Sequence, residues 1–167
     1  MSVSDAVPAA LPLSDGVVDL RLIRVIGPEE ADARPANAQF MATAPEHRFA
    51  IHRVEDGVRV GRIHLRITSD PVVLRAVGHL GYAVDDAHQR RGYATRAVRL
   101  IRRLAAQHDV GPLWVLIAPD NVASRRTVER AGFTLVDIVE ASAEALGMGV
   151  APVVCRYMAQ GSTLRDV

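Results

Sequence analysis

The stretch Gln89-Arg90-Arg91-Gly92-Tyr93-Ala94 follows an apolar segment with strand character, Leu80 to Val84, and opens a long amphipathic segment. A strand, a tight loop with a glycine and a helix start together form an anion site. The first N–H groups of a helix have no intrahelical partner, and the helix dipole adds a partial positive charge there. Gly92 lets the backbone approach a ligand closely, and Arg90 and Arg91 add charge-assisted donors that suit phosphate. The stretch therefore predicts a site for a phosphate-bearing ligand.

The chain before this stretch carries strand patterns. Apolar and polar residues alternate from Val17 to Val25, which indicates a half-buried strand. Phe49 to Val54 and Val58 to Ile67 flank Glu55-Asp56-Gly57, and an acidic pair followed by glycine between two such patterns indicates a hairpin. Val77 to Val84 is expected to form the next strand.

The chain after this stretch mixes helix and strand patterns. Apolar residues recur at helical spacing from Gly92 to His108, with arginines largely on the other faces, which predicts an amphipathic helix. Leu113 to Ala118 is a short continuous apolar run, typical of a strand buried on both sides. Asn121 can cap a further helix, which Gly132 ends. The remaining expectations are strands at Phe133 to Val139 and Val153 to Met158, a looser segment from Glu140 to Ala151, and short helical pieces from Pro28 to Met41.

These patterns predict one α/β domain. We expect a single, mostly antiparallel central sheet of about six to seven strands, with helices packed on it. A chain of 167 residues, 49% of them hydrophobic, is large enough to bury one core. The domain is expected over residues 16–160, after a flexible N-terminal lead-in at 1–15 and before a C-terminal tail at 161–167.

Composition narrows the function classes. The formal net charge of +1 argues against a general nucleic-acid binder. No apolar run approaches the roughly 20 residues that span a bilayer, and no secretory signal pattern is present at the N-terminus. The single cysteine, Cys155, suits a reducing compartment, so a cytoplasmic protein is expected. All 20 basic residues are arginines, so no lysine is available as a Schiff-base nucleophile.

Three blocks of the chain stand in a fixed order. GHLGYAV at 78–84 leads into QRRGYA at 89–94, LWVLIA follows at 113–118, and PDNVASRRTVERAGF follows at 119–133. This order resembles the GNAT superfamily of acetyl-CoA-dependent N-acetyltransferases, with its Q/R-x-x-G-x-G/A loop and its Asn-x-x-Ser/Ala helix ending in Gly-Phe. The bacterial branch near the ribosomal-protein N-acetyltransferases is the part of the family that the chain resembles.

The resemblance implies the GNAT fold, with helices on both faces of the sheet, and acetyl-CoA as cosubstrate. The backbone at Val84 would hold the pantetheine arm as an added strand, and the N–H groups from Gln89 to Thr95 would hold the pyrophosphate. Asn121 would bind near the thioester, with Ser124 one helical turn along the same face. Each role has an alternative. Gly92 is then an ordinary turn glycine, Asn121 only a helix cap, and Arg90 and Arg91 a solvated surface pair. The cofactor-binding residues implied are Val84, Gln89, Arg90, Arg91, Gly92, Tyr93, Ala94, Thr95, Asn121 and Ser124.

Acyl transfer to an amine requires a deprotonated amine and a leaving thiolate. His79 is the candidate base, because some aralkylamine-specific members carry a histidine there and an imidazole with a pKa of ~6.5 can accept a proton; its alternative is a structural hydrogen bond. Many members carry an acid tyrosine seven residues after the motif asparagine, where this chain has Val128. Ser124 is therefore the candidate acid. Tyr157 is a second candidate, with core packing as its alternative, and a thiol with a pKa of ~8.5 can also leave unaided.

No metal is expected, because the histidines are scattered without the spacing of metal ligands. Cys155 is expected to be a buried strand residue rather than a nucleophile. Arg96 departs from an acidic residue that related members often carry, and it is expected to be exposed. Asp85 and Asp86 are expected in a solvated turn, because carboxylates repel a pyrophosphate.

The sequence thus predicts an N-acetyltransferase that moves an acetyl group from acetyl-CoA to a primary amine by direct attack in a ternary complex. The acceptor would be a small molecule or a peptide, selected by the loops Pro28 to Arg48 and Glu140 to Pro152. Neither nucleic acid nor membrane is an expected partner, and a monomer or homodimer is expected. Two other interpretations stay open: a non-catalytic acyl-CoA-binding module that regulates a partner, and, more weakly, an oxidoreductase, whose loop needs the glycines of G-x-G-x-x-G.

Overall fold

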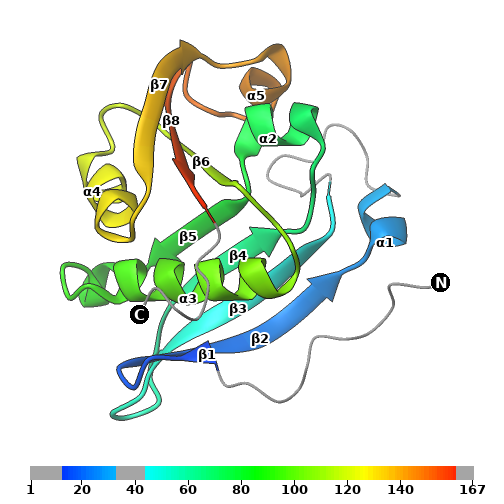
Figure 1. The fold of residues 1–167 in the computed structure, drawn as a ribbon. Coiled ribbons are helices and arrows are strands. Elements are labelled where there is room, and N and C mark those ends of the chain that lie inside the picture. Colours follow the sequence, from blue (N-terminus) through cyan, green and yellow to red (C-terminus); the bar gives the residue numbers. More distant parts are fainter. Residues whose placement is uncertain (1–12, 33–43, 161–167) are drawn as a thin grey trace.

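Two antiparallel sheets and five α-helices make up the described part of the chain (Figure 1). The computed structural model describes residues 13–32 and 44–160. Most of the expected lead-in, most of the expected helical pieces before Met41 and the expected tail lie outside the described residues. The strands are β1 (Leu13–Ser14), β2 (Val18–Ile26), β3 (Glu46–Arg53), β4 (Arg59–Arg66), β5 (Leu80–Val84), β6 (Leu113–Ile117), β7 (Thr134–Glu140) and β8 (Val153–Ala159). The helices are α1 (Pro28–Asp32), α2 (Pro71–Val77), α3 (Tyr93–Gln107), α4 (Val122–Arg130) and α5 (Ala143–Gly147), with one 3-10 turn at Asp86–His88.

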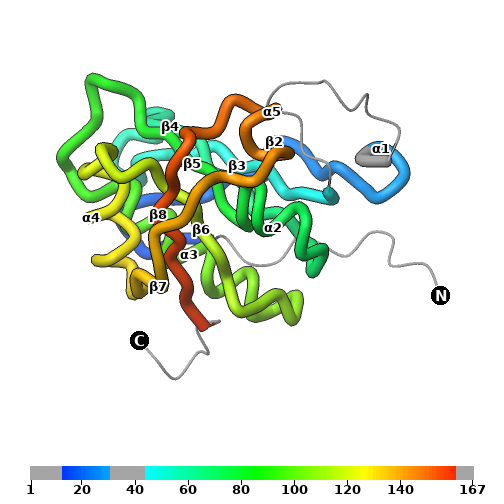
Figure 2. Tube along the Cα trace, turned by 90° about the horizontal axis from the view of Figure 1, so that it is seen from above, coloured from blue at the N-terminus to red at the C-terminus, as the bar shows by residue number. Residues whose placement is uncertain are grey.

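The α/β class and the antiparallel pairing are confirmed, but the expected single sheet divides in two. One sheet has the order β1-β2-β3-β4-β5 and the other the order β6-β8-β7. At the start of β5, the His79 N–H donates to the Trp114 carbonyl at 2.7 Å. Beyond that bond, β5 and β6 share no strand ladder within the described residues. Strands β7 and β8 pair with each other, and their traces lie together in the view from above (Figure 2).

Helix α3 packs on one face of the five-stranded sheet and forms the centre of the core. Its buried face meets Phe49 and Ile51 of β3 and Ile63 and Leu65 of β4 in one hydrophobic cluster. Each fully buried side chain of this kind stabilises the folded state by roughly 1.5–3 kcal/mol. The expected helix over Gly92 to His108 is therefore confirmed. The core residues of α3 are Tyr93, Ala97, Val98, Leu100, Ile101, Leu104 and Ala105.

Two short helices were missed from the sequence. Helix α2 fills most of the segment before β5, so that strand starts at Leu80 rather than at Val77. Its N-cap is Asp70, whose carboxylate accepts from the Val72 N–H at 2.8 Å, with Pro71 at the first helical position. Helix α5 lies in the segment expected to be loose and is capped in the same way by Ser142.

Other local expectations hold. The β3–β4 hairpin turns at Gly57, whose φ of +71° is the left-handed conformation that glycine permits. Asn121 caps α4, its side-chain oxygen accepting from the Ser124 N–H at 3.2 Å. Strand β6 is less buried than expected, because Trp114 and Leu116 alternate with fully buried neighbours and are only half-buried.

Candidate acyl-CoA site between the two sheets

The loop from β5 to α3 has the backbone shape of an anion site. Arg90 and Gly92 both adopt left-handed conformations, with φ of +61° and +78°. Turns of this kind direct successive N–H groups toward one side and form anion-binding concavities. Gly92 is the N-cap of the 15-residue helix α3, and a Cβ added there would have no atom within 4 Å. Open space therefore lies in front of the backbone at the positive end of a long helix dipole.

A row of N–H groups in this loop is unengaged. Within the described residues, no N–H from Arg90 to Thr95 donates to a backbone carbonyl, and the first bond of α3 runs from the Arg96 N–H to the Gly92 carbonyl at 3.2 Å. The side chains of Tyr93 and Thr95 are buried, so these two residues offer a ligand only their backbone. The row matches the predicted pyrophosphate donors except at one end.

That end is Gln89. Its N–H already donates to the Asp86 carbonyl at 3.4 Å. Its side-chain amide donates to the Val84 carbonyl at 3.1 Å and to the Asp86 carboxylate at 3.0 Å. Gln89 thus holds the loop to the end of β5 by hydrogen bonds. The sequence motif did not indicate this role.

The edge of β5 that faces β6 carries free backbone groups. Toward β4, the Asp85 N–H donates to the Val60 carbonyl at 2.9 Å, and the His79 carbonyl accepts from the Arg66 N–H at 2.8 Å. Because bonding alternates along an antiparallel strand, Leu80, Tyr82 and Val84 direct their N–H and C=O groups to the opposite edge. The Val84 carbonyl already accepts from the Gln89 side chain. The other groups of this edge are open to the bonds of an added strand.

Tyr82 joins the two walls of the site. Its hydroxyl lies 2.7 Å from the Ser124 hydroxyl and donates to the Ser124 carbonyl at 3.2 Å. Ser124 sits in the first turn of α4, one turn after Asn121. Burial raises the pKa of the Tyr82 phenol, although the hydrogen bond with Ser124 acts in the other direction. Sequence reasoning missed Tyr82, whose only signal was its place in the strand pattern before the loop.

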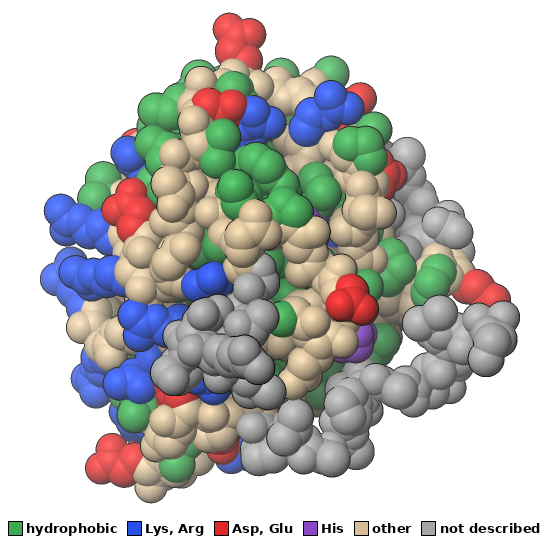
Figure 3. Space-filling model, viewed as in Figure 1, with side chains coloured by type: hydrophobic (Ala, Val, Ile, Leu, Met, Phe, Trp, Pro, Cys, Tyr) green, Lys and Arg blue, Asp and Glu red, His purple; other side chains and the backbone are tan. Residues whose placement is uncertain are grey.

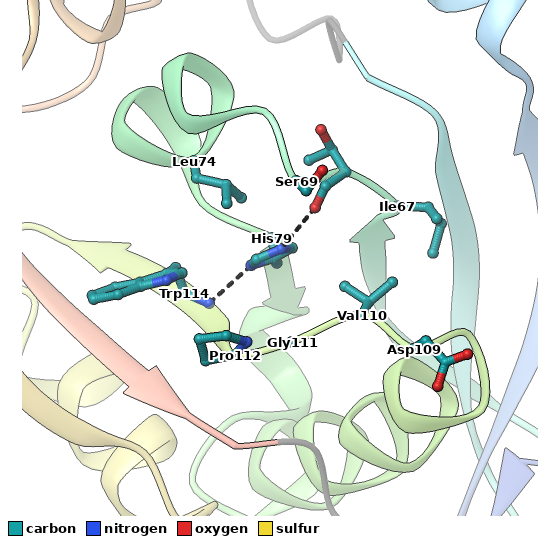
Figure 4. Close-up of a pocket in the computed structure, with 10 residues that line it drawn as sticks. Ile67, Ser69, Leu74, His79, Asp109, Val110, Gly111, Pro112 and Trp114 are labelled. Carbon is teal, nitrogen blue, oxygen red and sulfur yellow. Dashed lines mark hydrogen bonds between the residues drawn. The ribbon is translucent and has the colours of Figure 1, made fainter.

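His79 has a structural hydrogen-bond pattern. Its Nδ1 accepts from the Trp114 N–H at 2.9 Å, so Nε2 carries the proton and donates to the Thr68 carbonyl at 3.1 Å (Figure 4). The residue is 2% exposed, and burial holds the pKa of the imidazole below its ordinary value. Neither ring nitrogen has a lone pair free for an amine proton. The geometry argues against the predicted base role and for the structural alternative.

The cavity beside His79 is separate from the loop site. It encloses about 450 Å³ between the start of β5, the start of β6 and α2 (Figure 4). His79 precedes β5 and the loop follows Val84, so the cavity and the loop lie at opposite ends of the strand, roughly 17 Å apart. The lining residues are Ile67, Thr68, Ser69, Leu74, His79, Asp109, Val110, Gly111, Pro112 and Trp114.

Tyr157, the second predicted acid, points into a different network. It is fully buried on β8, its hydroxyl donates to Glu129 at 2.7 Å, and it accepts from Arg125 at 3.0 Å. These bonds tie β8 to α4, which favours the packing alternative. Val128 is likewise fully buried in the core. Ser124 is thus the one predicted acid whose hydroxyl lies against β5.

Exposed arginines lie on the loop, α3 and α4, with the exposed Asp85 and Asp86 before the loop. Figure 3 shows arginine side chains gathered along the left edge of the molecule, where α3 and α4 lie in Figure 1. Such a field raises the local concentration of an anionic ligand. Arg96, whose side chain is 40% exposed, pairs with Asp15 at 2.8 Å, and this pair connects the β1–β2 turn to α3. The exposed arginines of the loop, α3 and α4 include Arg90, Arg91, Arg99, Arg126 and Arg130.

Two further findings concern residues 13–32 and 44–160 alone. No group of three or more His, Cys, Asp or Glu side chains there is placed to hold a metal ion. No helix there is long and apolar enough to cross a membrane. Cys155 is buried and free, as expected.

Three features lie together in this site. Strands β5 and β6 share no ladder, the loop at Gly92 has unengaged N–H groups, and Asn121 caps α4. These features define an acyl-CoA-binding class of α/β protein. Residues 17–134 match the acetyltransferase (GNAT) domain family, so the chain belongs to that family. The predicted family, its fold and its acetyltransferase class are confirmed at this level. Comparison with the curated proteins gave no match.

Solved structures share the fold at low sequence identity. A protein from Vibrio cholerae, provisionally described as a ribosomal-protein-serine acetyltransferase, is 16% identical with a TM-score of 0.59, over 90% of this chain and 98% of that one. Ribosomal-protein-S5-alanine acetyltransferase from Vibrio fischeri is 18% identical with a TM-score of 0.55, over 70% of this chain and 62% of that one. The microcin C7 self-immunity acetyltransferase MccE, in complex with acetyl-CoA and AMP, is 19% identical with a TM-score of 0.54, over 69% and 61%. This chain thus spans less than two thirds of the length of the last two proteins.

Proposed function

We propose that this protein transfers the acetyl group of acetyl-CoA to a primary amine of a small molecule or peptide, by direct attack in a ternary complex. The observation that carries the proposal is the row of unengaged N–H groups from Arg90 to Thr95, which opens beside the free edge of β5. A pyrophosphate and an extended amide-bearing arm need these two features in this order.

The residues present fit coenzyme A. The loop N–H groups and Arg90 or Arg91 hold the pyrophosphate, with Gly92 allowing the close approach. The free edge of β5 at Val84 and Tyr82 holds the pantetheine arm, and Asn121 and Ser124 lie toward its thioester end. The similar protein MccE is in complex with acetyl-CoA and AMP, which supports coenzyme A as the class of ligand.

The chemistry needs little from side chains. The neutral amine attacks the thioester carbonyl from the side opposite the pantetheine arm, and its nitrogen then loses a proton to solvent. Free-edge N–H groups of β5 stabilise the negative charge that develops on the carbonyl oxygen. Ser124 donates a proton to the departing thiolate, which is already a tolerable leaving group at its ordinary pKa of ~8.5.

The acceptor remains a class rather than a compound. Two of the similar structures are described as acetyltransferases of ribosomal proteins, which supports a peptide amine as one candidate beside small-molecule amines. The segments 28–48 and 140–152 are proposed to select it, and residues 33–43 of the first segment lie outside the described residues. We further propose that the protein works in the cytoplasm, as a monomer or homodimer.

The test is release of free CoA thiol from acetyl-CoA, measured with a panel of amino acids, polyamines, aminoglycosides and N-terminal peptides. An acetyltransferase gives thiol release that depends on one class of amine, with an acetylated product of the expected mass. The alternative, a non-catalytic acyl-CoA-binding module, gives tight CoA binding by calorimetry and no amine-dependent release with any acceptor.

A further inference from the structure

Two hydroxyl groups from opposite walls of the site meet where β5 and β6 diverge. Tyr82 lies in the middle of β5, and Ser124 lies in the first turn of α4. Their side-chain oxygens are 2.7 Å apart, the length of a strong O–H···O bond. The two residues are 42 positions apart in sequence, so the fold rather than local chain geometry brings them together.

The contact lies on the path proposed for the acyl arm. The backbone of Tyr82 faces the free edge of β5, two residues before Val84, roughly 7 Å along the strand from the loop end. An arm that starts at the pyrophosphate loop and runs along this edge passes Val84 first and Tyr82 next. The hydroxyl pair therefore stands beside the thioester end of the arm.

Tyr82 determines where the Ser124 hydroxyl points. A serine or threonine inside a helix tends to donate to the carbonyl four residues earlier. Thr127 of the same helix does so, its hydroxyl donating to the Ala123 carbonyl at 3.0 Å. Ser124 lies in the first turn, where no helical carbonyl stands four residues before it, and its hydroxyl bonds to Tyr82. The Tyr82 hydroxyl has one hydrogen, and both the Ser124 carbonyl and the Ser124 hydroxyl are within its reach. When Tyr82 gives this hydrogen to the Ser124 hydroxyl rather than to the carbonyl, the Ser124 hydrogen is left for another acceptor.

We propose that Tyr82 is a positioning residue for the leaving group, holding Ser124 so that its hydroxyl donates to the CoA sulfur. The inference rests on the proposed function. As the amine nitrogen bonds to the carbonyl carbon, the C–S bond breaks and its electron pair goes to sulfur. The Ser124 proton passes to sulfur and the Tyr82 proton passes to Ser124. The proton lost by the amine returns to Tyr82 through solvent, so one proton moves in total from amine to thiol. The phenol is protonated at neutral pH at its ordinary pKa of ~10, and burial raises that pKa further.

The test measures the ionisation of the CoA thiol in the bound state, which needs no acceptor. Thiolate absorbs in the ultraviolet at shorter wavelength than the aromatic bands of proteins, and thiol does not. CoA is therefore titrated with base while it is bound at saturation to the wild type, Tyr82→Phe, Ser124→Ala and Thr127→Ala, and the titration of each protein without CoA is subtracted. Hydrogen bonds to a thiolate favour the charged form. We expect the wild type to raise the thiol ionisation constant about tenfold over free CoA, and Tyr82→Phe to remove most of that gain.

Ser124→Ala leaves Tyr82 in place and is expected to give the same loss, which keeps the test valid if Tyr82→Phe folds poorly. Thr127→Ala removes a hydroxyl from the same helix and is expected to match the wild type. Two results overturn the inference but leave the proposed function intact. One is a thiol ionisation constant in the wild type equal to that of free CoA, and the other is a constant unchanged by Tyr82→Phe in a folded protein. Failure of CoA to bind the wild type overturns the proposed function and this inference together.

Discussion

Gly92 shows most clearly how one residue makes the site. Its φ of +78° suits glycine, and an added Cβ would project into open space rather than into protein. Gly57, at the tip of the β3–β4 hairpin, has φ of +71° and equally open surroundings. The two positions therefore carry the same backbone cost but differ in their relation to the proposed ligand.

We predict that Gly92→Ala and Gly57→Ala each lower the free energy of unfolding by about 1–2 kcal/mol, the cost of a left-handed residue with a Cβ. Only Gly92→Ala is expected to weaken CoA binding, by about tenfold or more, because its methyl group enters the space of the pyrophosphate. Urea unfolding and CoA calorimetry on both variants measure the two effects. Equal CoA affinities for the two variants would contradict the assignment of the loop.

At the scale of elements, His79 connects three segments. Its ring hydrogen-bonds to Thr68 in the loop after β4 and to Trp114 in β6. Its backbone N–H donates to the Trp114 carbonyl and so connects the two sheets at one end. His79→Gln is expected to lower the free energy of unfolding by about 1–3 kcal/mol, because buried backbone groups lose partners. His52→Gln is the control, since His52 makes one side-chain bond to Gly57 in the hairpin turn.

The His79→Gln variant also tests whether His79 is a structural residue or the catalytic base. If His79 is structural, the acidic limb of the pH profile for amine-dependent thiol release keeps its midpoint in His79→Gln. Loss of that limb in a stably folded variant would restore His79 as the base.

The elements that the sequence predicted were those with strong local signals. Local sequence was enough to predict three features: the amphipathic pattern of α3, the Glu-Asp-Gly turn and the Asn121 cap. Each of them depends only on residues close together in sequence. Helix α2 had a readable Asp70-Pro71 start that the apolar run before β5 obscured. Two features could not be predicted in this way: the division into two sheets and the contact between Tyr82 and Ser124. Both depend on which segments distant in sequence come together, and local patterns do not contain that information.

At the scale of the whole molecule, buried histidines make stability depend on pH. His64 on β4 packs against Gly81, and its Nε2 has no hydrogen-bond partner within the described residues. Burial, reinforced by Arg66, Arg48 and Arg62, lowers the pKa of His64 to about 3. Because the unfolded imidazole binds a proton below pH ~6.5 and the folded one does not, this stability is complete above ~6.5 and is lost as pH falls toward 3.

We therefore predict that the wild type loses about 2 kcal/mol more unfolding free energy than His64→Leu between pH 7 and pH 5. Urea unfolding of both proteins at the two pH values gives the comparison. Parallel losses in the two proteins would show that His64 does not carry this dependence.

The central claim is that the N–H groups from Arg90 to Thr95 hold the pyrophosphate of coenzyme A. Amide hydrogen exchange, measured with and without saturating CoA, tests it directly, because these groups have no backbone partner to slow their exchange. The account predicts protection concentrated in residues 90–95 and along β5, with the β3–β4 hairpin tip unchanged. Unchanged exchange at 90–95 in the presence of CoA would contradict it.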